Sequence, residues 1–439
     1  MSAQTITLGC RLNIAESAAM RELVRGSADD LVIVNSCAVT AEAVRQTRKA
    51  IRKARRERPD ARLFVTGCAV EIDPLSFESM PEVTRIVRGP DKFDAASFGL
   101  PGANAAPPYA VDETHARAFV EVQNGCDHRC TFCIIPHARG AARSLPAGAV
   151  IDRIRALVAA GKREIVLTGV DVTSYGGDLP GKPGLGNLVG RILRLAPDLP
   201  RLRLSSLDPV EIDDELIELI ESEPRLMPHL HLSLQAGDDM VLKRMKRRHL
   251  RADAIALVER IRAARPEVAI GADIIAGFPT ETEAMFANSL KIVAECDIVH
   301  GHIFPYSPRE GTPAARMPQV APEVARARAR LLREACEARR DAWLDRLVGT
   351  AQTMLVEQDG VTGHAEHFAK IRIVNPDPAR AGPAEAHSSS RTGKEEKGFD
   401  RPRPNAGERP GKETMLAGRI ATVTIVGREG DELLGRIGG

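Results

Sequence analysis

No stretch of this 439-residue chain approaches the ~18 consecutive apolar residues that a membrane-spanning helix needs. The first ten residues, MSAQTITLGC, lack the basic segment followed by an apolar segment that is typical of a secretory signal. We therefore expect a cytoplasmic protein without a membrane partner.

Aromatic residues and an excess of one charge are also scarce. The chain has 11 Phe, 3 Tyr and 1 Trp, so its cores must be built mainly from Leu, Ile, Val and Ala. Its 61 Lys and Arg residues nearly balance 59 Asp and Glu residues, so the net charge of +2 by itself does not point to any kind of partner. The length exceeds the roughly 100 to 200 residues of a usual domain, which predicts two or three domains.

Eight cysteines are present, and their positions carry the information. In a reducing cytosol, regularly placed cysteines are more typical of metal binding or catalysis than of disulfides.

Residues 1–100 repeat one pattern three times: a short apolar run, a cysteine, and a helix-like stretch. This alternation predicts an α/β domain with a doubly wound parallel sheet, whose ligand edge lies at the carboxyl ends of the strands. We expect the fold to bring the three cysteines together there; the alternative is that they are small buried hydrophobic residues. The runs and cysteines are Thr5–Leu8 with Cys10, Leu31–Val34 with Cys37, and Leu63–Val65 with Cys68.

A Pro- and Gly-rich linker at 99–118 precedes a second domain, which we place at 115–345. Six strand-then-helix units predict a partial (β/α)6 barrel, whose chemistry would lie at the carboxyl ends of its strands. The expected strands are Phe119–Val122, Ile165–Thr168, Leu202–Ser205, Leu230–Leu234, Ala269–Ile275 and Val299–Pro305. The polar residues at their ends are Asn124, Asp171, Asp208, Gln235, Asp273 and Tyr306.

After a long helix at 322–347, residues 346–439 show strand-like alternation at 352–357, 369–374 and 419–426, which predicts a small β domain. Residues 375–414 have almost no large apolar side chains and cannot bury enough surface to offset their ordering entropy. We therefore expect a disordered insertion there.

The most specific motif is a Cys-x3-Cys-x2-Cys formed by Cys126, Cys130 and Cys133, directly after the first barrel strand. Three thiolates on one loop can hold three irons of a [4Fe-4S] cluster and leave the fourth iron open for a substrate. The alternative is a zinc site completed by His128 or His137.

This loop and its barrel resemble the radical S-adenosylmethionine (SAM) superfamily, in which the open iron binds SAM and a reduced cluster cleaves it to a 5'-deoxyadenosyl radical. The strings LGCRLN, VNSCAVT, VTGCAV and GCDHRCTFCIIPHARG narrow the resemblance to the methylthiotransferases. The resemblance covers the whole chain except the insertion.

The resemblance implies two [4Fe-4S] clusters, one on Cys126, Cys130 and Cys133 and a sulfur-carrying one on Cys10, Cys37 and Cys68. It also implies that Gln235, Asp273 and Tyr306 line the SAM and substrate side of the barrel; alternatively, each braces a strand end. The terminal β domain resembles the TRAM module, which binds tRNA in this family. An electron donor of the flavodoxin or ferredoxin kind is an implied partner whose identity stays open.

Three basic clusters favour an RNA substrate, although a charge run is often only a solvated helix face. They are 45–58, 243–251 and 326–333, and Lys370 and Arg372 alternate along a strand of the terminal domain.

Residues 37–52 are most similar to the branch of the family that acts on N6-threonylcarbamoyladenosine in tRNA, which is therefore the function we predict. The alternatives are the isopentenyladenosine branch, the branch acting on a ribosomal-protein aspartate, and a non-catalytic iron-sulfur RNA-binding regulator. Cys296 and Cys336 lie in apolar helical contexts, so we expect them to be packed side chains.

Overall fold

The computed structural model describes residues 3–25, 27, 29–100, 114–374 and 416–438. The expected insertion at 375–414 and most of the expected linker lie outside these residues. The chain forms two compact units: the larger contains the N-terminal sheet and the barrel, and the smaller contains the C-terminal strands. No helix in the described ranges combines the length and the hydropathy needed to cross a bilayer.

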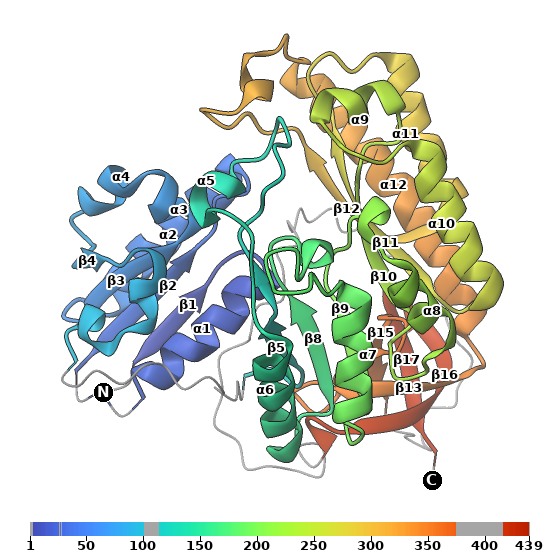
Figure 1. The fold of residues 1–439 in the computed structure, drawn as a ribbon, viewed down its shortest axis with the longest axis horizontal. Helices are drawn as coiled ribbons and strands as arrows, with labels where there is room; N and C mark the ends of the chain where they lie inside the picture. Colours follow the sequence, from blue (N-terminus) through green and yellow to red (C-terminus); the bar gives the residue numbers. More distant parts are fainter. Residues whose placement is uncertain (1–2, 26, 28, 101–113, 375–415, 439) are drawn as a thin grey trace, which may run out of the picture. The chain divides into compact units, whose positions relative to one another are not determined.

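The N-terminal sheet has four parallel strands in the order β1-β2-β3-β4 (Figure 1). Alternate residues of β2 point to opposite faces: Ile33 packs with Met20 of α1, and Val34 packs with Ile51 of α2. Helices therefore cover both faces of a parallel sheet, as expected. The elements are β1 (Gln4–Thr7), α1 (Arg11–Leu23), β2 (Leu31–Ser36), α2 (Ala41–Glu57), β3 (Arg62–Gly67), α3 (Cys68–Ile72), α4 (Pro74–Glu78) and β4 (Arg85–Ile86).

Six parallel strands form the barrel domain, in two three-stranded sheets, β5-β8-β9 and β10-β11-β12. A bridge between Leu207 and Leu232 joins the two sheets. This arrangement confirms the predicted six-unit architecture, and each observed strand overlaps its predicted range. The strands are β5 (Ala118–Glu121), β8 (Glu164–Thr168), β9 (Arg201–Leu204), β10 (His229–Gln235), β11 (Ala269–Ala276) and β12 (Ile298–Pro305).

Helices cover the outside of these strands (Figure 1) and share one apolar core with them. Cys296 and Cys336 belong to this core, so they are packed side chains, as expected. The helix α7 was not predicted from the sequence. Its first turn contains glycine where it packs closely on α8, since a Cβ at Gly186 would lie 2.4 Å from the Leu216 nitrogen. The helices are α6 (Ala147–Ala159), α7 (Leu185–Leu195), α8 (Asp214–Ser222), α10 (Arg251–Ala264), α11 (Glu283–Glu295) and α12 (Pro322–Leu347).

Charged side chains occupy the amino-terminal end of the barrel strands. The side chain of Glu164 is completely buried. It forms ion pairs with Arg117 at 3.0 Å and with Arg203 at 2.8 Å. Burial opposes the ionisation of Glu164, but the guanidinium groups prevail and lower its pKa to about 2. A buried ionic cluster therefore closes the amino-terminal end of the barrel.

The smaller unit contains a closed five-stranded barrel in the order β13-β14-β15-β17-β16. The closed barrel agrees with the small β-barrel that the sequence predicts, although β14 and β17 were not recognised there. The strands are β13 (Ala351–Val356), β14 (Thr362–Ala365), β15 (Lys370–Ile373), β16 (Ile420–Glu429) and β17 (Glu432–Ile437).

Candidate functional site

The cysteine loop begins at the end of the short strand β6 (Gln123–Asn124) and is closed at its base. The Cys126 N–H donates a hydrogen bond to the Gly140 carbonyl at 3.1 Å. Gly125 has a φ of +73°, and a Cβ there would lie 1.9 Å from the Ala141 carbonyl oxygen. Only glycine fits this combination of left-handed backbone and close approach.

The far side of the loop is fastened to two other segments. The Thr131 N–H donates to the Met245 carbonyl at the end of α9 (Asp239–Met245), and the Thr131 carbonyl accepts from the Ala314 N–H. Next to it, Phe132 packs against an apolar cluster that contains Phe278. The three cysteines therefore lie on a loop with fixed ends.

The three thiols of this loop lie within electrostatic reach of one another. Burial raises the pKa of Cys126 to about 12, and the negative charges of Asp171, Cys133 and Cys130 raise it further. Burial likewise raises the pKa of Cys133 to about 11. Half-buried thiolates of this kind are stabilised by a metal centre that balances their charge, so the donor set fits an iron-sulfur cluster.

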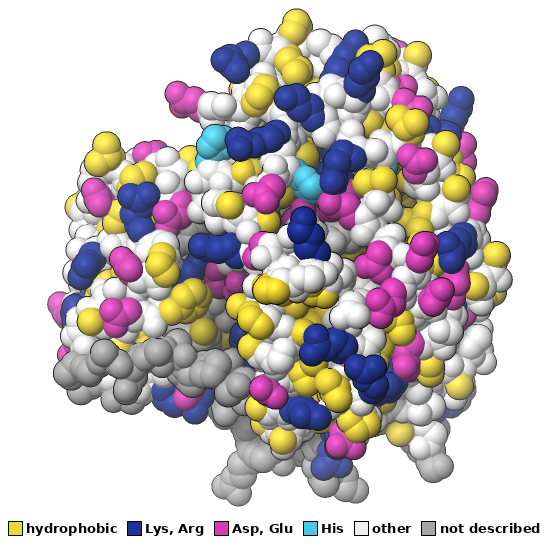
Figure 2. Space-filling model, in the orientation of Figure 1, with side chains coloured by type: hydrophobic (Ala, Val, Ile, Leu, Met, Phe, Trp, Pro, Cys, Tyr) yellow, Lys and Arg dark blue, Asp and Glu magenta, His cyan; other side chains and the backbone are white. Residues whose placement is uncertain are grey.

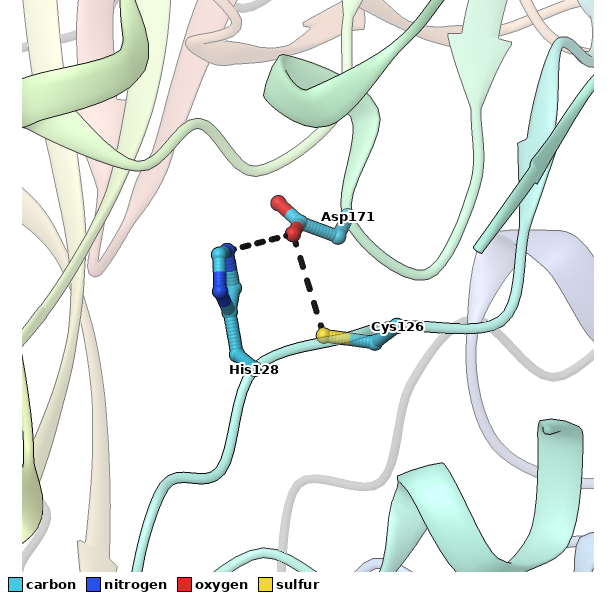
Figure 3. A group of neighbouring side chains, drawn as sticks. All are labelled: Cys126, His128 and Asp171. Atoms are coloured by element: carbon cyan, nitrogen blue, oxygen red, sulfur yellow. Dashed lines mark hydrogen bonds and ion pairs between the residues drawn. The ribbon is translucent and has the colours of Figure 1, made fainter. Parts of the chain in front are cut away.

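His128 points toward Asp171 rather than standing free as a fourth ligand (Figure 3). Its Nε2 lies 2.7 Å from Asp171 Oδ2, and the same oxygen accepts from the Cys126 thiol at 3.7 Å. Hydrogen bonds to Asp171 and Glu211 raise the pKa of His128 to about 10. His128 Nε2 already lies between the carboxylates of Asp171 and Glu211, and His137 is exposed on α5 (Ile135–Arg139), so the geometry favours the cluster over a Cys3His zinc site.

The fold brings the three N-terminal cysteines together, although they are far apart in sequence. Burial raises the pKa of Cys37 to about 12, and Cys10 and Cys68 raise it further. Gly9 has a φ of +97°, and a Cβ there would lie 2.7 Å from the Cys37 Cβ. The close approach of these two strand ends therefore depends on glycine.

The two triads lie near each other within the larger unit. Cys68 is among the groups that raise the pKa of Cys133. Arg139, at the end of α5, donates from Nε to the Cys68 sulfur at 3.1 Å. Arg139 lies within GCDHRCTFCIIPHARG, and its position six residues after the last cysteine of the loop is the signal by which the sequence could have revealed it.

Gln235, Asp273 and Tyr306 all lie at or near the carboxyl ends of strands, but no hydrogen bond joins these three described side chains. Gln235 has a φ of +68° at a register shift between β10 and β11, a strained conformation typical of functional sites. Tyr306 lies edge-on to the Phe278 ring at 5.6 Å, in the apolar cluster that holds Phe132.

Asp273 is held between two histidines that the sequence reading missed. Its Oδ1 lies 3.1 Å from His231 Nε2 and 3.4 Å from His302 Nδ1. Burial opposes its ionisation, but the two imidazoles keep the pKa of Asp273 well below its usual value. Their alternation along β10 and β12, opposite the apolar residues, is the pattern that could have revealed them.

Two other strand-end residues are linked to the cysteine loop, Asn124 directly and Asp208 through Arg247. Asn124 Oδ1 accepts from the Gly125 N–H at 2.9 Å. Asp208 accepts from Arg247 at 2.9 Å, and the same guanidinium lies 3.7 Å from the Cys130 sulfur. Residues at the ends of three barrel strands, Asn124, Asp171 and Asp208, therefore contribute to the surroundings of one loop, which is the usual position of chemistry in such barrels.

The basic clusters are partly neutralised. Figure 2 shows Lys and Arg side chains interspersed with Asp and Glu side chains. In the cluster at 326–333, Arg328 is buried against Glu281 at 2.8 Å, so it serves the fold. In the terminal barrel, Lys370 and Arg372 both pair with Glu432, at 3.0 and 2.8 Å. The cations of these clusters that remain exposed include Lys49 on α2 and Lys243 on α9.

Comparison with known proteins defines the class first. Residues 120–293 match the model of the radical SAM superfamily, and residues 2–89 match a family described as uncharacterized protein family UPF0004. The fold is similar to that of the radical SAM methyltransferase TsrM from Kitasatospora setae, with a TM-score of 0.51, 17% identity, and coverage of 71% of this chain and 74% of that one. The chain is a radical SAM protein.

Two relatives narrow the class. The chain is 45% identical to "Threonylcarbamoyladenosine tRNA methylthiotransferase MtaB" of Rickettsia prowazekii, over 84% of this chain and 91% of the relative. It is 35% identical to "tRNA-2-methylthio-N(6)-dimethylallyladenosine synthase" of Erythrobacter litoralis, over 81% and 86%. The chain therefore belongs to the radical SAM tRNA methylthiotransferases.

Proposed function

We propose that the protein inserts a methylthio group at C2 of N6-threonylcarbamoyladenosine at position 37 of tRNA. The observation that carries the proposal is the 45% identity to the Rickettsia enzyme of that name, ten points above the Erythrobacter enzyme named for dimethylallyladenosine. The proximity of two cysteine triads supports the same reaction class.

Cys126, Cys130 and Cys133 would hold the radical-generating [4Fe-4S] cluster, and Cys10, Cys37 and Cys68 would hold the second one. When bound, the first cluster with SAM supplies the radical chemistry, and the second supplies the sulfur. Arg247 places a cation beside the Cys130 sulfur, where thiolate charge accumulates. The fastened loop ends keep these sulfurs in one geometry through the reaction.

Gln235, Asp273 and Tyr306 would line the SAM and substrate side of the barrel. The threonylcarbamoyl group carries a carboxylate and a hydroxyl, whereas the isopentenyl group is apolar. The polar side chains of His231, Asp273 and His302 at this end of the barrel suit the first group better, because polar groups covered by an apolar substituent would lose their hydrogen bonds to water without replacement.

Transfer RNA would approach through sequence-independent attraction of its phosphates to the exposed lysines and arginines. The reaction needs an electron donor, for which a flavodoxin or ferredoxin is our proposal. We place the protein in the cytoplasm, where its tRNA substrate is found.

Nucleoside mass spectrometry of tRNA from a deletion strain tests the function. We expect loss of 2-methylthio-N6-threonylcarbamoyladenosine and accumulation of the unmethylthiolated nucleoside, reversed by the wild-type gene. Loss of the 2-methylthio derivative of isopentenyladenosine instead would show that the protein belongs to the isopentenyladenosine branch. Unchanged tRNA would contradict both tRNA activities and leave the ribosomal-protein aspartate or a non-catalytic regulator as the function.

A further inference from the structure

Arg139 occupies an unusual position between the two cysteine triads. It is the last residue of α5 and only 6% exposed, and its side chain reaches three residues of the N-terminal sheet domain. Nε donates to the Cys68 sulfur at 3.1 Å, Nη1 donates to Glu16 at 2.5 Å, and Nη2 donates to Asn13 Oδ1 at 2.6 Å. Every nitrogen of the guanidinium is therefore used in one fork.

Asn13 extends this fork to the other two cysteines of the N-terminal triad. Its Nδ2 donates to the carbonyl of Leu8, two residues before Cys10, at 2.6 Å, and to the carbonyl of Ser36, next to Cys37, at 3.0 Å. Its Oδ1 lies 3.8 Å from the Cys10 sulfur. Arg139 thus contacts one cysteine directly and reaches the other two through a single buried amide.

The backbone next to Arg139 closes the radical loop. The adjoining Gly140 carbonyl accepts the Cys126 N–H, and Nη1 of Arg139 lies 3.5 Å from Asn124 Oδ1, which also accepts the Gly125 N–H. A shift of Arg139 would therefore move the start of the loop and the N-terminal triad relative to each other.

The carboxylate of Glu16 holds the Arg139 guanidinium in place through a buried ion pair. It is fully buried and also pairs with Lys92 at 2.6 Å. A buried carboxylate shared by two cations is costly to desolvate and contributes little net stability, so such clusters are better explained by specificity of geometry.

We propose that Arg139 is a positioning residue that sets the spacing between the two cysteine triads and stabilises the thiolate charge of Cys68. The inference rests on the proposed function, in which one substrate carbon must first meet the radical and then receive sulfur from the second cluster. Because the Arg139 guanidinium is bonded to the N-terminal triad and to the start of the cysteine loop, it keeps both triads within reach of the reacting substrate carbon.

The test compares Arg139→Gln with Arg328→Gln in the reconstituted full-length protein. The control is matched, because Arg328 is also 6% exposed and also pairs with a carboxylate, Glu281, that is 0% exposed. We expect Arg139→Gln to keep SAM cleavage but to lower the methylthio product formed per 5'-deoxyadenosine, by a factor on the order of 10² if the reacting groups move by about 1 Å. Arg328→Gln should leave this ratio unchanged.

A second readout does not depend on turnover. In a background with Cys126, Cys130 and Cys133 changed to Ala, the remaining reduced cluster should show a changed electron paramagnetic resonance spectrum when Arg139 becomes Gln, and should lose iron to a chelator faster. Arg139→Lys keeps the charge but lacks the fork; it should fold and still show a lowered product ratio, which covers the case in which Arg139→Gln is unstable.

An unchanged product ratio together with an unchanged spectrum would overturn the proposal, as would a parallel loss of SAM cleavage and product in both Arg139 variants. The proposed function fails differently, because the wild-type protein would then form no methylthio product on threonylcarbamoylated tRNA. The spectroscopic comparison would still decide the role of Arg139 in that case.

Discussion

The two cysteine triads reach the same chemical arrangement by opposite routes. Cys126, Cys130 and Cys133 lie within one eight-residue segment, so the local chain alone keeps them close. The N-terminal cysteines follow three different strands and meet only because parallel strands end at one edge. The first triad is thus a property of a loop, and the second is a property of a sheet.

Glycines with a positive φ precede cysteines in both triads. Gly125 precedes the first cysteine of the loop with a φ of +73°, and Gly9 and Gly67 precede two of the N-terminal cysteines with φ values of +97° and +93°. In the loop the glycine permits a turn onto a neighbouring carbonyl, whereas in the sheet Gly9 lets one strand end approach the cysteine of another.

The largest predicted effect separates the two triads chemically. Changing all three loop cysteines to Ala should abolish SAM cleavage and lower iron from about eight to about four per chain. Changing Cys10, Cys37 and Cys68 to Ala should remove the same amount of iron but leave SAM cleavage and abolish only methylthio transfer. Iron assays and chromatography of 5'-deoxyadenosine measure both, and SAM cleavage by the loop variant would refute the assignment.

The two triads also differ in where a completely buried carboxylate lies. Glu16 lies beside the N-terminal triad, whereas Glu164 lies at the opposite, amino-terminal end of the barrel strands. Glu164→Gln should destabilise the fold by about 3–5 kcal/mol, because it leaves Arg117 and Arg203 buried without their carboxylate. Urea unfolding at pH 7 measures this. The control Glu267→Gln removes an exposed partner of Arg265 and should cost less than about 1 kcal/mol.

The stabilising effect of Glu164 on the free energy of unfolding should depend on pH. The folded pKa of Glu164 is about 2, below the unfolded value of about 4.5, so its contribution is complete above pH ~4.5 and is lost as the pH falls toward 2. The difference in unfolding free energy between wild type and Glu164→Gln should shrink over that window. A difference that stays constant from pH 6 to pH 3 would contradict the role of its charge.

Glycine substitutions should produce a smaller and selective effect. Gly125→Ala should impair only the loop cluster and Gly9→Ala only the N-terminal one, each with about 1–3 kcal/mol of backbone strain. Gly161→Ala is the control, because Gly161 has a φ of +94° but nothing within 4 Å of its would-be Cβ. Equal iron loss in all three variants would show that strain, rather than contact with the cysteine segments, is responsible.

The smallest effects concern tRNA binding near each triad. Lys243→Gln, beside the loop, and Lys49→Gln, on the helix after Cys37, should each weaken binding a few-fold and lower the slope of log affinity against log salt by about 1. Lys370→Gln should change affinity less, because Lys370 already pairs with Glu432. Filter binding at several salt concentrations measures this, and a larger effect at Lys370 would reverse the ranking.

Much of the architecture was predictable because it follows from short-range patterns. Alternation of apolar runs and helices indicated the parallel sheet and the six barrel strands, and alternation in the last ninety residues indicated the small β-barrel. The element α7 escaped because its glycines, which allow close packing on α8, resemble a loop in sequence. The partners of Asp273 escaped because two separate strands supply them.

The sequence by itself determined the loop triad, since the spacing of Cys126, Cys130 and Cys133 limits their separation in any fold. It also determined the strand ends at which the other cysteines lie. Only the tertiary structure decided that Cys68 meets Arg139 and that Lys370 is paired with Glu432, because such contacts join residues 62 to 71 positions apart. The spacing of ligands along one segment determines what that segment can bind. A buried charged side chain, in contrast, meets a partner that is distant in sequence only when the chain has folded.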